Sequence, residues 1–109
     1  MENLLEKKQR INLLMDLYEE LLTDKQREYL DLYYNQDLSL SEIALIKNVS
    51  KNAVFDNLKK AISHLENYEA KLQLLDKHLE RLAIIDQLEK DIKEKHENID
   101  EHLKMLRDL

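Results

Sequence analysis

The chain has 109 residues, of which 43% are hydrophobic and 37% charged, and its 17 Lys and Arg against 23 Asp and Glu give a formal net charge of −6. This length suits one domain with a modest core, and the acidic balance argues against a nonspecific nucleic-acid coat while leaving room for a local basic face. Gly, Pro and Cys are absent, which excludes disulfides, thiol chemistry and glycine-based hairpins, so we predict an all-α fold.

The first predicted helix covers residues 4–22. Apolar residues recur there at helical spacing and predict one buried stripe, made of Leu4, Ile11, Leu14, Met15, Tyr18, Leu21 and Leu22. The N-terminal segment lacks a basic start followed by an apolar run, so we expect no secretion signal and no membrane insertion, and a cytoplasmic protein.

A second helix should begin after Thr23, which is a good N-cap with Gln26 at the third position, and run to about Asn35. Its tyrosines, Tyr29, Tyr33 and Tyr34, could form a ligand site. We interpret them as scaffold, packed with their hydroxyls at the edge of the core.

The stretch from Leu38 to Lys60 predicts a helix-turn-helix. Ser39 and Glu42 form a capping box for a short helix, which Asn48 can end because Asn tolerates the left-handed conformation. The buried face of this helix is predicted to hold Leu40, Ile43, Ala44 and Ile46, with Val49 buried in the turn. Ser50 is the predicted N-cap of the following helix, which buries Val54, Leu58, Ala61, Ile62 and Leu65.

The opposite side of that helix has the layout of a recognition helix in a DNA major groove. Asn52 can pair with adenine and Phe55 can contact a thymine methyl group, whereas Asp56 would repel phosphate. The predicted nucleic-acid-binding residues are Lys47, Lys51, Asn52, Phe55, Asp56, Lys59 and Lys60, with Lys25 and Arg27 as further candidates for phosphate contacts.

The recognition helix should continue past Leu65 through a short leucine seam, formed by Tyr68, Leu72, Leu75, Leu79 and Leu82. After Leu82 the apolar residues no longer occupy the seam positions, so we expect a bend or a new helix near Asp86. A final short helix should carry Ile99, Leu103 and Leu106, with Asn98 as its N-cap. We divide the chain into a helical domain, residues 1–70, and an extension, residues 71–109, that serves packing or dimerisation.

Catalytic and metal-binding patterns are lacking. The four histidines, His64, His78, His96 and His102, contain no i, i+4 pair, and the carboxylates alternate with lysines as on a solvated surface. A chain without Gly also lacks phosphate-binding loops of the nucleotide-binding kind. We therefore predict no enzymatic activity, no metal and no cofactor.

Residues 22–61, LTDKQREYLDLYYNQDLSLSEIALIKNVSKNAVFDNLKKA, resemble the fourth conserved region of bacterial sigma factors, a four-helix module that reads a promoter element. Continued by ISHLENYEAKL, the run is similar to the YlxM family of small bacterial proteins, which join such a helix-turn-helix to a long C-terminal helix. Departures from the pattern are Asn48 in place of the usual turn Gly, and Lys51-Asn52 in place of a more basic or glutamine-containing pair.

The resemblance implies a link to the signal recognition particle, because family members are encoded beside the genes for its GTPase and receptor. One expectation is a homodimeric regulator that binds DNA or the particle's RNA. The alternative is a non-enzymatic adaptor or RNA-binding accessory factor that docks on the particle's GTPase.

Overall fold

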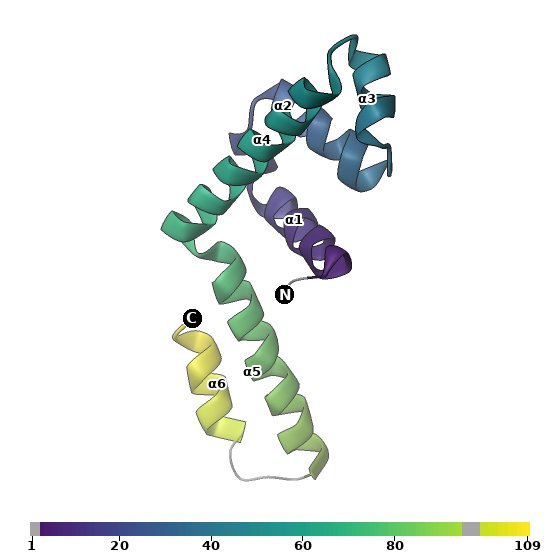
Figure 1. Cartoon of the computed structure of the whole chain (residues 1–109). Coiled ribbons are helices and arrows are strands. Elements are labelled where there is room, and N and C mark those ends of the chain that lie inside the picture. Colours follow the sequence, from purple (N-terminus) through teal and green to yellow (C-terminus); the bar gives the residue numbers. More distant parts are fainter. Residues whose placement is uncertain (1–2, 95–98) are drawn as a thin grey trace. The chain divides into compact units, whose positions relative to one another are not determined.

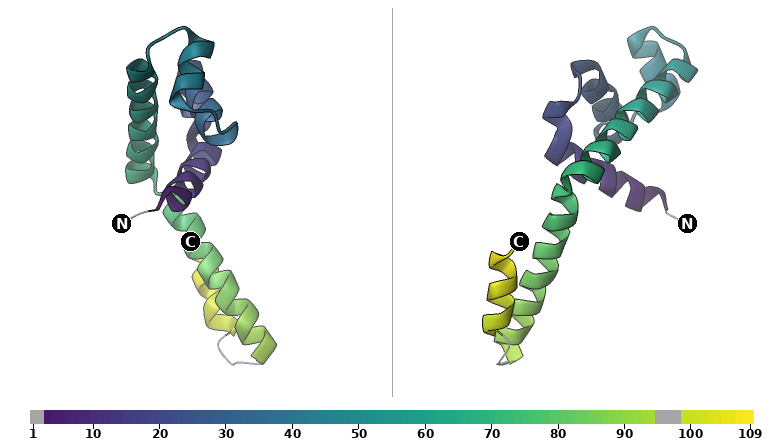
Figure 2. Two further views of the ribbon diagram at one scale, coloured as in Figure 1. Left: turned by 45° about the vertical axis from the view of Figure 1, so that its right-hand side comes forward. Right: turned by 90° about the vertical axis from the view of Figure 1, so that its left-hand side faces the viewer.

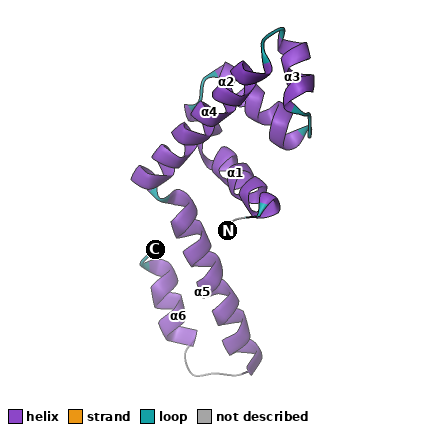
Figure 3. Ribbon diagram, in the orientation of Figure 1, coloured by secondary structure: helices purple, strands orange, loops and turns teal. Residues whose placement is uncertain are grey.

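The computed structural model describes residues 3–94 and 99–109, and all regular secondary structure in these ranges is helical (Figures 1 and 3). This confirms the predicted all-α fold with a helix-turn-helix and a helical extension. The chain divides into two compact units, Met1–Leu72 and Gln73–Leu109. His96 and the predicted N-cap Asn98 lie outside the described residues.

The first unit is built around one long helix, α4. In chain order it contains α1 (Leu4–Tyr18), a 3-10 turn η1 (Glu19–Leu21), α2 (Asp24–Leu30), a π-helical turn η2 (Asp31–Asn35), α3 (Leu40–Lys47) and α4 (Lys51–Leu72). Helices α1, α2 and α3 each contact α4 (Figure 2). The core therefore forms along α4, and its most deeply buried side chains include Leu14, Leu30, Ile43, Val54 and Leu65.

The predicted start of α2 is confirmed at atomic detail. Thr23 Oγ1 accepts a hydrogen bond from the Gln26 backbone N–H, and Gln26 Oε1 accepts one from the Thr23 N–H, both at 3.1 Å. Tyr29 and Tyr34 are buried in the core, as the scaffold interpretation requires.

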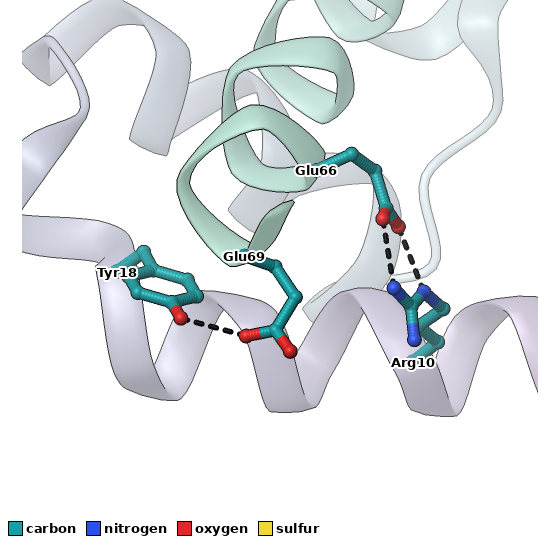
Figure 4. A network of polar contacts seen from close by, with 4 residues as sticks. All are labelled: Arg10, Tyr18, Glu66 and Glu69. Atoms are coloured by element: carbon teal, nitrogen blue, oxygen red, sulfur yellow. Dashed lines mark hydrogen bonds and ion pairs between the residues drawn. The ribbon is translucent and has the colours of Figure 1, made fainter. Parts of the chain in front are cut away.

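Polar contacts fix α1 against the C-terminal half of α4. The Tyr18 hydroxyl donates to Glu69 Oε1 at 2.7 Å, and the Arg10 guanidinium donates two hydrogen bonds of 2.8 Å to the Glu66 carboxylate (Figure 4). Tyr18 and Glu69 are both buried, whereas Arg10 and Glu66 are about two-fifths exposed. The two contacts lie about two turns apart on α1 and about one turn apart on α4, so they fix both the distance and the register of these helices.

Several predictions of burial are wrong. In α1 and η1 the stripe is correct for Ile11, Leu14, Met15 and Tyr18, but Leu4 is 86% exposed and Leu21 is 53% exposed. The predicted single helix over residues 4–22 ends at Tyr18, and the 3-10 turn that follows rotates Leu21 out of the stripe.

Two further errors concern the helix-turn-helix. Ile46 is 59% exposed and Val49 is 40% exposed, although both were expected in the core. Helix α3 has only eight residues, so a single side chain, Ile43, reaches full burial against α4, and the residues near the turn stay in solvent.

The second unit is a helical hairpin of α5 (Leu74–Glu94) and α6 (Ile99–Arg107), which contact each other. The predicted final helix is thus confirmed. Of the bend or new helix expected near Asp86, the new helix is wrong because α5 continues through this residue. The interruption lies instead at Gln73, which adopts a left-handed φ of 56°. In the hairpin the buried Asp91 accepts a hydrogen bond from Gln87 Nε2 at 3.1 Å and faces His102 Nδ1.

Candidate nucleic-acid interface

Three capping interactions shape the helix-turn-helix. Ser39 Oγ accepts from the Glu42 N–H and Glu42 Oε1 accepts from the Ser39 N–H, both at 3.1 Å. Asn48 ends α3 in the left-handed conformation, with φ 54° and ψ 48°. Ser50 Oγ then accepts from the Ala53 N–H at 3.0 Å and begins α4. All three were predicted from the sequence, and together they fix where each helix of the motif starts and stops.

The buried side of α4 determines which residues it presents outward. Val54, Leu58, Ala61 and Leu65 are at most 5% exposed, and burial of each large aliphatic side chain contributes about 1.5–3 kcal/mol. Successive residues of an α-helix are turned by about 100°. Asn52 and Asp56 therefore lie opposite the core, which is the position that a recognition helix gives to its base-reading residues.

All six candidate residues on α4 are exposed: Lys51, Asn52, Phe55, Asp56, Lys59 and Lys60. They do not share one narrow stripe. Asp56 lies near the middle of the outward arc, Phe55 and Lys59 lie toward one flank, and Lys60 lies toward the other. The outward face is thus a carboxylate bordered by cations, which weakens attraction to phosphate relative to an all-basic helix.

Lys47, the candidate on α3, is already engaged within the protein. Its ammonium group forms an ion pair with Glu28 and lies 5.8 Å from the centre of the Tyr29 ring. Its side chain is 21% exposed. Arg27 is likewise paired, with Asp24. These partners lie on α2, and nothing in the local sequence around Lys47 indicates that its charge is shared in this way.

Sequence reasoning missed a cavity beside α4. It has a volume of about 350 Å³ and is lined by residues of four elements, among them Lys7 of α1, Tyr33 of η2, Leu40 of α3, and Phe55, Lys59 and Ile62 of α4. Tyr33 and Tyr34 form an edge-to-face pair with ring centroids 5.0 Å apart. Burial first, and Tyr33 second, raise the pKa of Tyr34 above its usual value, so the Tyr34 hydroxyl stays neutral.

The turn of the motif also exposes apolar side chains. Leu45 is 83% exposed, alongside Ile46 and Val49. Metal-ligating clusters of three or more His, Cys, Asp or Glu are not found among residues 3–94 and 99–109. Over the same part of the chain, the helices are too short or too polar to cross a membrane.

An all-helical unit in which two capped helices meet at a left-handed Asn turn, with the second helix offering an outward polar face, defines a helix-turn-helix protein. Comparison with known proteins agrees. Residues 5–106 match the family described as "Putative helix-turn-helix protein, YlxM / p13 like", and the chain belongs to this family.

Relatives match over nearly their whole length. A UPF0122 protein of Oceanobacillus iheyensis is 44% identical over 106 residues, which cover 97% of this chain and 99% of that protein. A UPF0122 protein of Bacillus cereus strain AH187 is 48% identical over 103 residues, covering 94% of this chain and 93% of the relative. Relatives that are this similar over nearly whole chains share the same fold.

Proposed function

We propose that this protein is a DNA-binding regulatory protein without enzymatic activity, in which residues 1–70 contact nucleic acid and the extension, residues 71–109, serves assembly. The observation that supports this most strongly is the outward face of α4. One side of α4 is buried in the core and the Ser50 cap fixes where the helix starts, so Asn52 and Asp56 are held away from the core.

In this proposal the side chains divide into two roles. Asn52 hydrogen-bonds an adenine edge and Phe55 packs on a thymine methyl group. Lys51, Lys59 and Lys60 contact phosphates, which position the helix without reading sequence. Lys47 contributes less because its charge is shared with Glu28. Asp56 repels the phosphate backbone of the nucleic acid and keeps the affinity of a single copy low.

We further propose that the protein acts in the signal recognition particle pathway in the cytoplasm. The support is the resemblance to the YlxM family, whose members are encoded beside the particle's GTPase and receptor. The particle's RNA is then a second nucleic acid to test beside DNA, and its GTPase is the protein partner to test.

A homodimer completes the proposal, because one copy leaves many apolar side chains in solvent. On α1 and η1, Leu13, Leu17 and Leu21 recur every four residues and are all exposed. The hairpin of α5 and α6 leaves Leu79, Leu82, Ile85 and Ile92 exposed as well. Exposed apolar stripes of this kind mark association surfaces.

Fluorescence anisotropy tests the nucleic-acid role, using labelled DNA from upstream of the protein's own operon and the particle's RNA, each at two salt concentrations. We expect binding that weakens as salt rises, because lysine contacts release counterions. A Lys51→Ala, Lys59→Ala, Lys60→Ala variant should bind more weakly. The matched control replaces three exposed lysines of α5, Lys77, Lys90 and Lys93, with alanine and should leave binding nearly unchanged. Salt-sensitive binding to neither nucleic acid would refute the proposal.

The second candidate is an adaptor that docks on the particle's GTPase or acts as an RNA-binding accessory factor. Asp56 on the outward face and the exposed Leu45 at the turn favour it. A pull-down from cell extract, with and without nuclease, separates the two functions. Recovery of the GTPase that survives nuclease supports the adaptor, and recovery that depends on intact nucleic acid counts against it.

A further inference from the structure

The cavity beside α4 adjoins a second one of about 360 Å³. Both are lined by Lys7, Tyr33 and Tyr34, and the second extends past Leu4 and Leu38 toward Asp37 and Glu42. Because they share these three lining residues, we treat the two cavities as one groove, which we call the tyrosine groove. It lies between α1, η2 and the start of α3, with one end against α4 and the other at Asp37 and Glu42.

The floor of the tyrosine groove is apolar and incompletely covered. Phe55 is 54% exposed and Leu4 is 86% exposed, whereas Leu58 and Tyr34 beneath are buried. Covering a large apolar side chain such as Phe55 is favourable in proportion to the area removed from water. An occupant must therefore bring apolar side chains of its own.

The concave shape argues against duplex DNA as that occupant. A recognition element must protrude to enter the major groove, and here Asn52 and Asp56 protrude while the tyrosine groove recedes beside them. Asp37 and Glu42 line the end away from α4 and would repel phosphates there, so any acidic groups of an occupant belong at the α4 end. A hydrophobic groove of this kind matches the way proteins bind an amphipathic helix, whose apolar residues at i, i+3 or i+4 and i+7 enter the groove.

Charge at the α4 end specifies the occupant further. Lys7 from α1 and Lys59 from α4 line the same cavity, and both are exposed. Neither forms an ion pair with another residue in the ranges 3–94 and 99–109. The neighbouring Lys8, by contrast, is paired with Asp37. Two cations without an ion pair in the described part of the chain, beside an apolar floor, complement carboxylates that flank an apolar helix face.

We propose that the tyrosine groove binds an acidic amphipathic helix of a partner protein, with apolar anchors over Tyr33, Phe55 and Ile62 and with carboxylates paired to Lys7 and Lys59. This site shares Phe55 and Lys59 with the proposed DNA contacts of α4, but its occupancy does not depend on DNA binding. Lys59 lies between the two surfaces, whereas Lys7 lines the groove and Lys60 lies on the flank of α4 away from Phe55.

The test begins with selection of helical peptides from a random display library against the full-length protein. We expect the selected peptides to carry apolar residues three or four apart, flanked by Asp or Glu. One of them, synthesised and titrated into 15N-labelled full-length protein, should shift the amide signals of Tyr33, Phe55 and Ile62 to saturation. Because the chain contains no Trp, a Trp in the peptide gives an independent fluorescence readout of affinity.

Charge reversal provides the decisive comparison. A Lys7→Glu, Lys59→Glu variant should bind the selected peptide about tenfold more weakly, and the same peptide with its acidic residues changed to Lys should bind that variant better than it binds the parent protein. A Lys60→Glu, Lys71→Glu variant changes two exposed lysines of α4 outside the groove lining, has the same net charge and should bind the acidic peptide as the parent does.

Three results would overturn the proposal. The first is selection of peptides without the acidic amphipathic pattern. The second is equal affinity of the selected peptide for the parent and for the Lys7→Glu, Lys59→Glu variant. The third is that the amide signals of the groove do not shift with the peptide but shift with protein concentration, with inorganic phosphate or with duplex DNA. The occupant would then be a second copy of the chain, a small anion or nucleic acid, respectively.

Discussion

Asn48 carries the backbone conformation on which the turn of the helix-turn-helix depends. A left-handed residue usually costs about 1–2 kcal/mol unless it is Gly, or Asn or Asp whose short side chains bond locally. In a chain without glycine, the three residues with positive φ are Asp37, Asn48 and Gln73 among residues 3–94 and 99–109. Asn48 is the one that sets the angle between α3 and α4.

Replacing Asn48 tests this role. Asn48→Ala should lower the free energy of unfolding by about 1 kcal/mol, because Ala pays the full left-handed cost. Asn48→Gly should be close to neutral, because Gly adopts this conformation freely and only its unfolded state is more flexible. Urea denaturation of the three proteins measures both differences. Equal losses for Ala and Gly would contradict the conformational explanation.

Asp31 opens the π-helical turn η2 and gives a pH-dependent prediction. Hydrogen bonds from Asn35 and then Gln36, both 2.8 Å long, lower the pKa of the Asp31 carboxyl below its usual value. A group whose pKa is lowered by folding stabilises the folded state above its ordinary pKa, and this contribution is lost as the pH falls through the lowered pKa. Because Asp31 is largely solvated, the effect should be small.

The comparison is between the parent protein and Asp31→Asn, unfolded by urea from neutral pH down to acid. The variant should be less stable at neutral pH, and the difference should shrink once the parent's carboxyl is protonated. A stability difference that stays constant over the whole pH range would show that the hydrogen bonds do not act through the charge of Asp31.

For single residues, the sequence predicted the interactions that join residues close together in the chain. Thr23, Ser39, Asn48 and Ser50 act over three or four residues, and their roles follow from residue type and spacing. Lys47 shows the limit. Its ion pair with Glu28 joins residues of two different helices, so the geometry of packing decides it and no local pattern could.

Among the elements, α1 and α4 are joined by contacts of very different burial. Tyr18 and Glu69 are buried, so the loss of the Tyr18 hydroxyl removes a hydrogen bond that water cannot easily replace. Arg10 and Glu66 are about two-fifths exposed, so water can solvate either partner when the other is removed.

We therefore expect Tyr18→Phe to lower the free energy of unfolding by about 1–3 kcal/mol, and Arg10→Gln to lower it by at most about 1 kcal/mol. Tyr68→Phe is a suitable control, because its hydroxyl also bonds across to the N-terminal segment, at the Leu21 carbonyl, but at an exposed site. Thermal unfolding of the three variants ranks them. A smaller loss for Tyr18→Phe than for Tyr68→Phe would contradict this account of the contact.

Helix boundaries were harder to predict than the helices themselves. The periodic apolar residues of α4 and α5 read as one nearly continuous pattern, so the interruption at Gln73 carries no Gly or Pro signal. The shift of the apolar positions near Asp86 is visible in the sequence, but α5 is unbroken there, because a surface helix accepts a displaced apolar stripe. In α1 and η1, Leu4 and Leu21 fit the helical period of apolar residues yet are exposed.

At the scale of the whole molecule, the exposed leucines of α1 and of the hairpin bear on the oligomeric state. We expect light scattering at micromolar concentration to give twice the 13.1 kDa mass of one chain. Leu79→Lys together with Leu82→Lys should shift the population toward the monomer, because charges at a dimer interface are costly to bury. A mass near 13.1 kDa for the parent protein would reject the dimer.

The sequence predicted the fold at this scale and the outward residues of α4, but not the tyrosine groove. Lys7, Tyr33 and Lys59 are far apart in the chain and meet only when α1, η2 and α4 pack together. Their residue types look like ordinary surface and core positions when they are read one helix at a time. A groove formed between elements has no signature in any one of them.

In our proposal the outward face of α4 contacts DNA, and substitution of Asp56, near the middle of that face, tests this contact. Anisotropy titrations with operon DNA should compare the parent protein, Asp56→Asn, and Glu80→Gln, which makes the same charge change on an exposed residue of α5. If the outward face contacts the phosphate backbone, Asp56→Asn should bind DNA several-fold more tightly, because it removes a repulsion at short range. The affinity of Glu80→Gln should stay close to that of the parent protein. Equal affinities for Asp56→Asn and Glu80→Gln would contradict the claim.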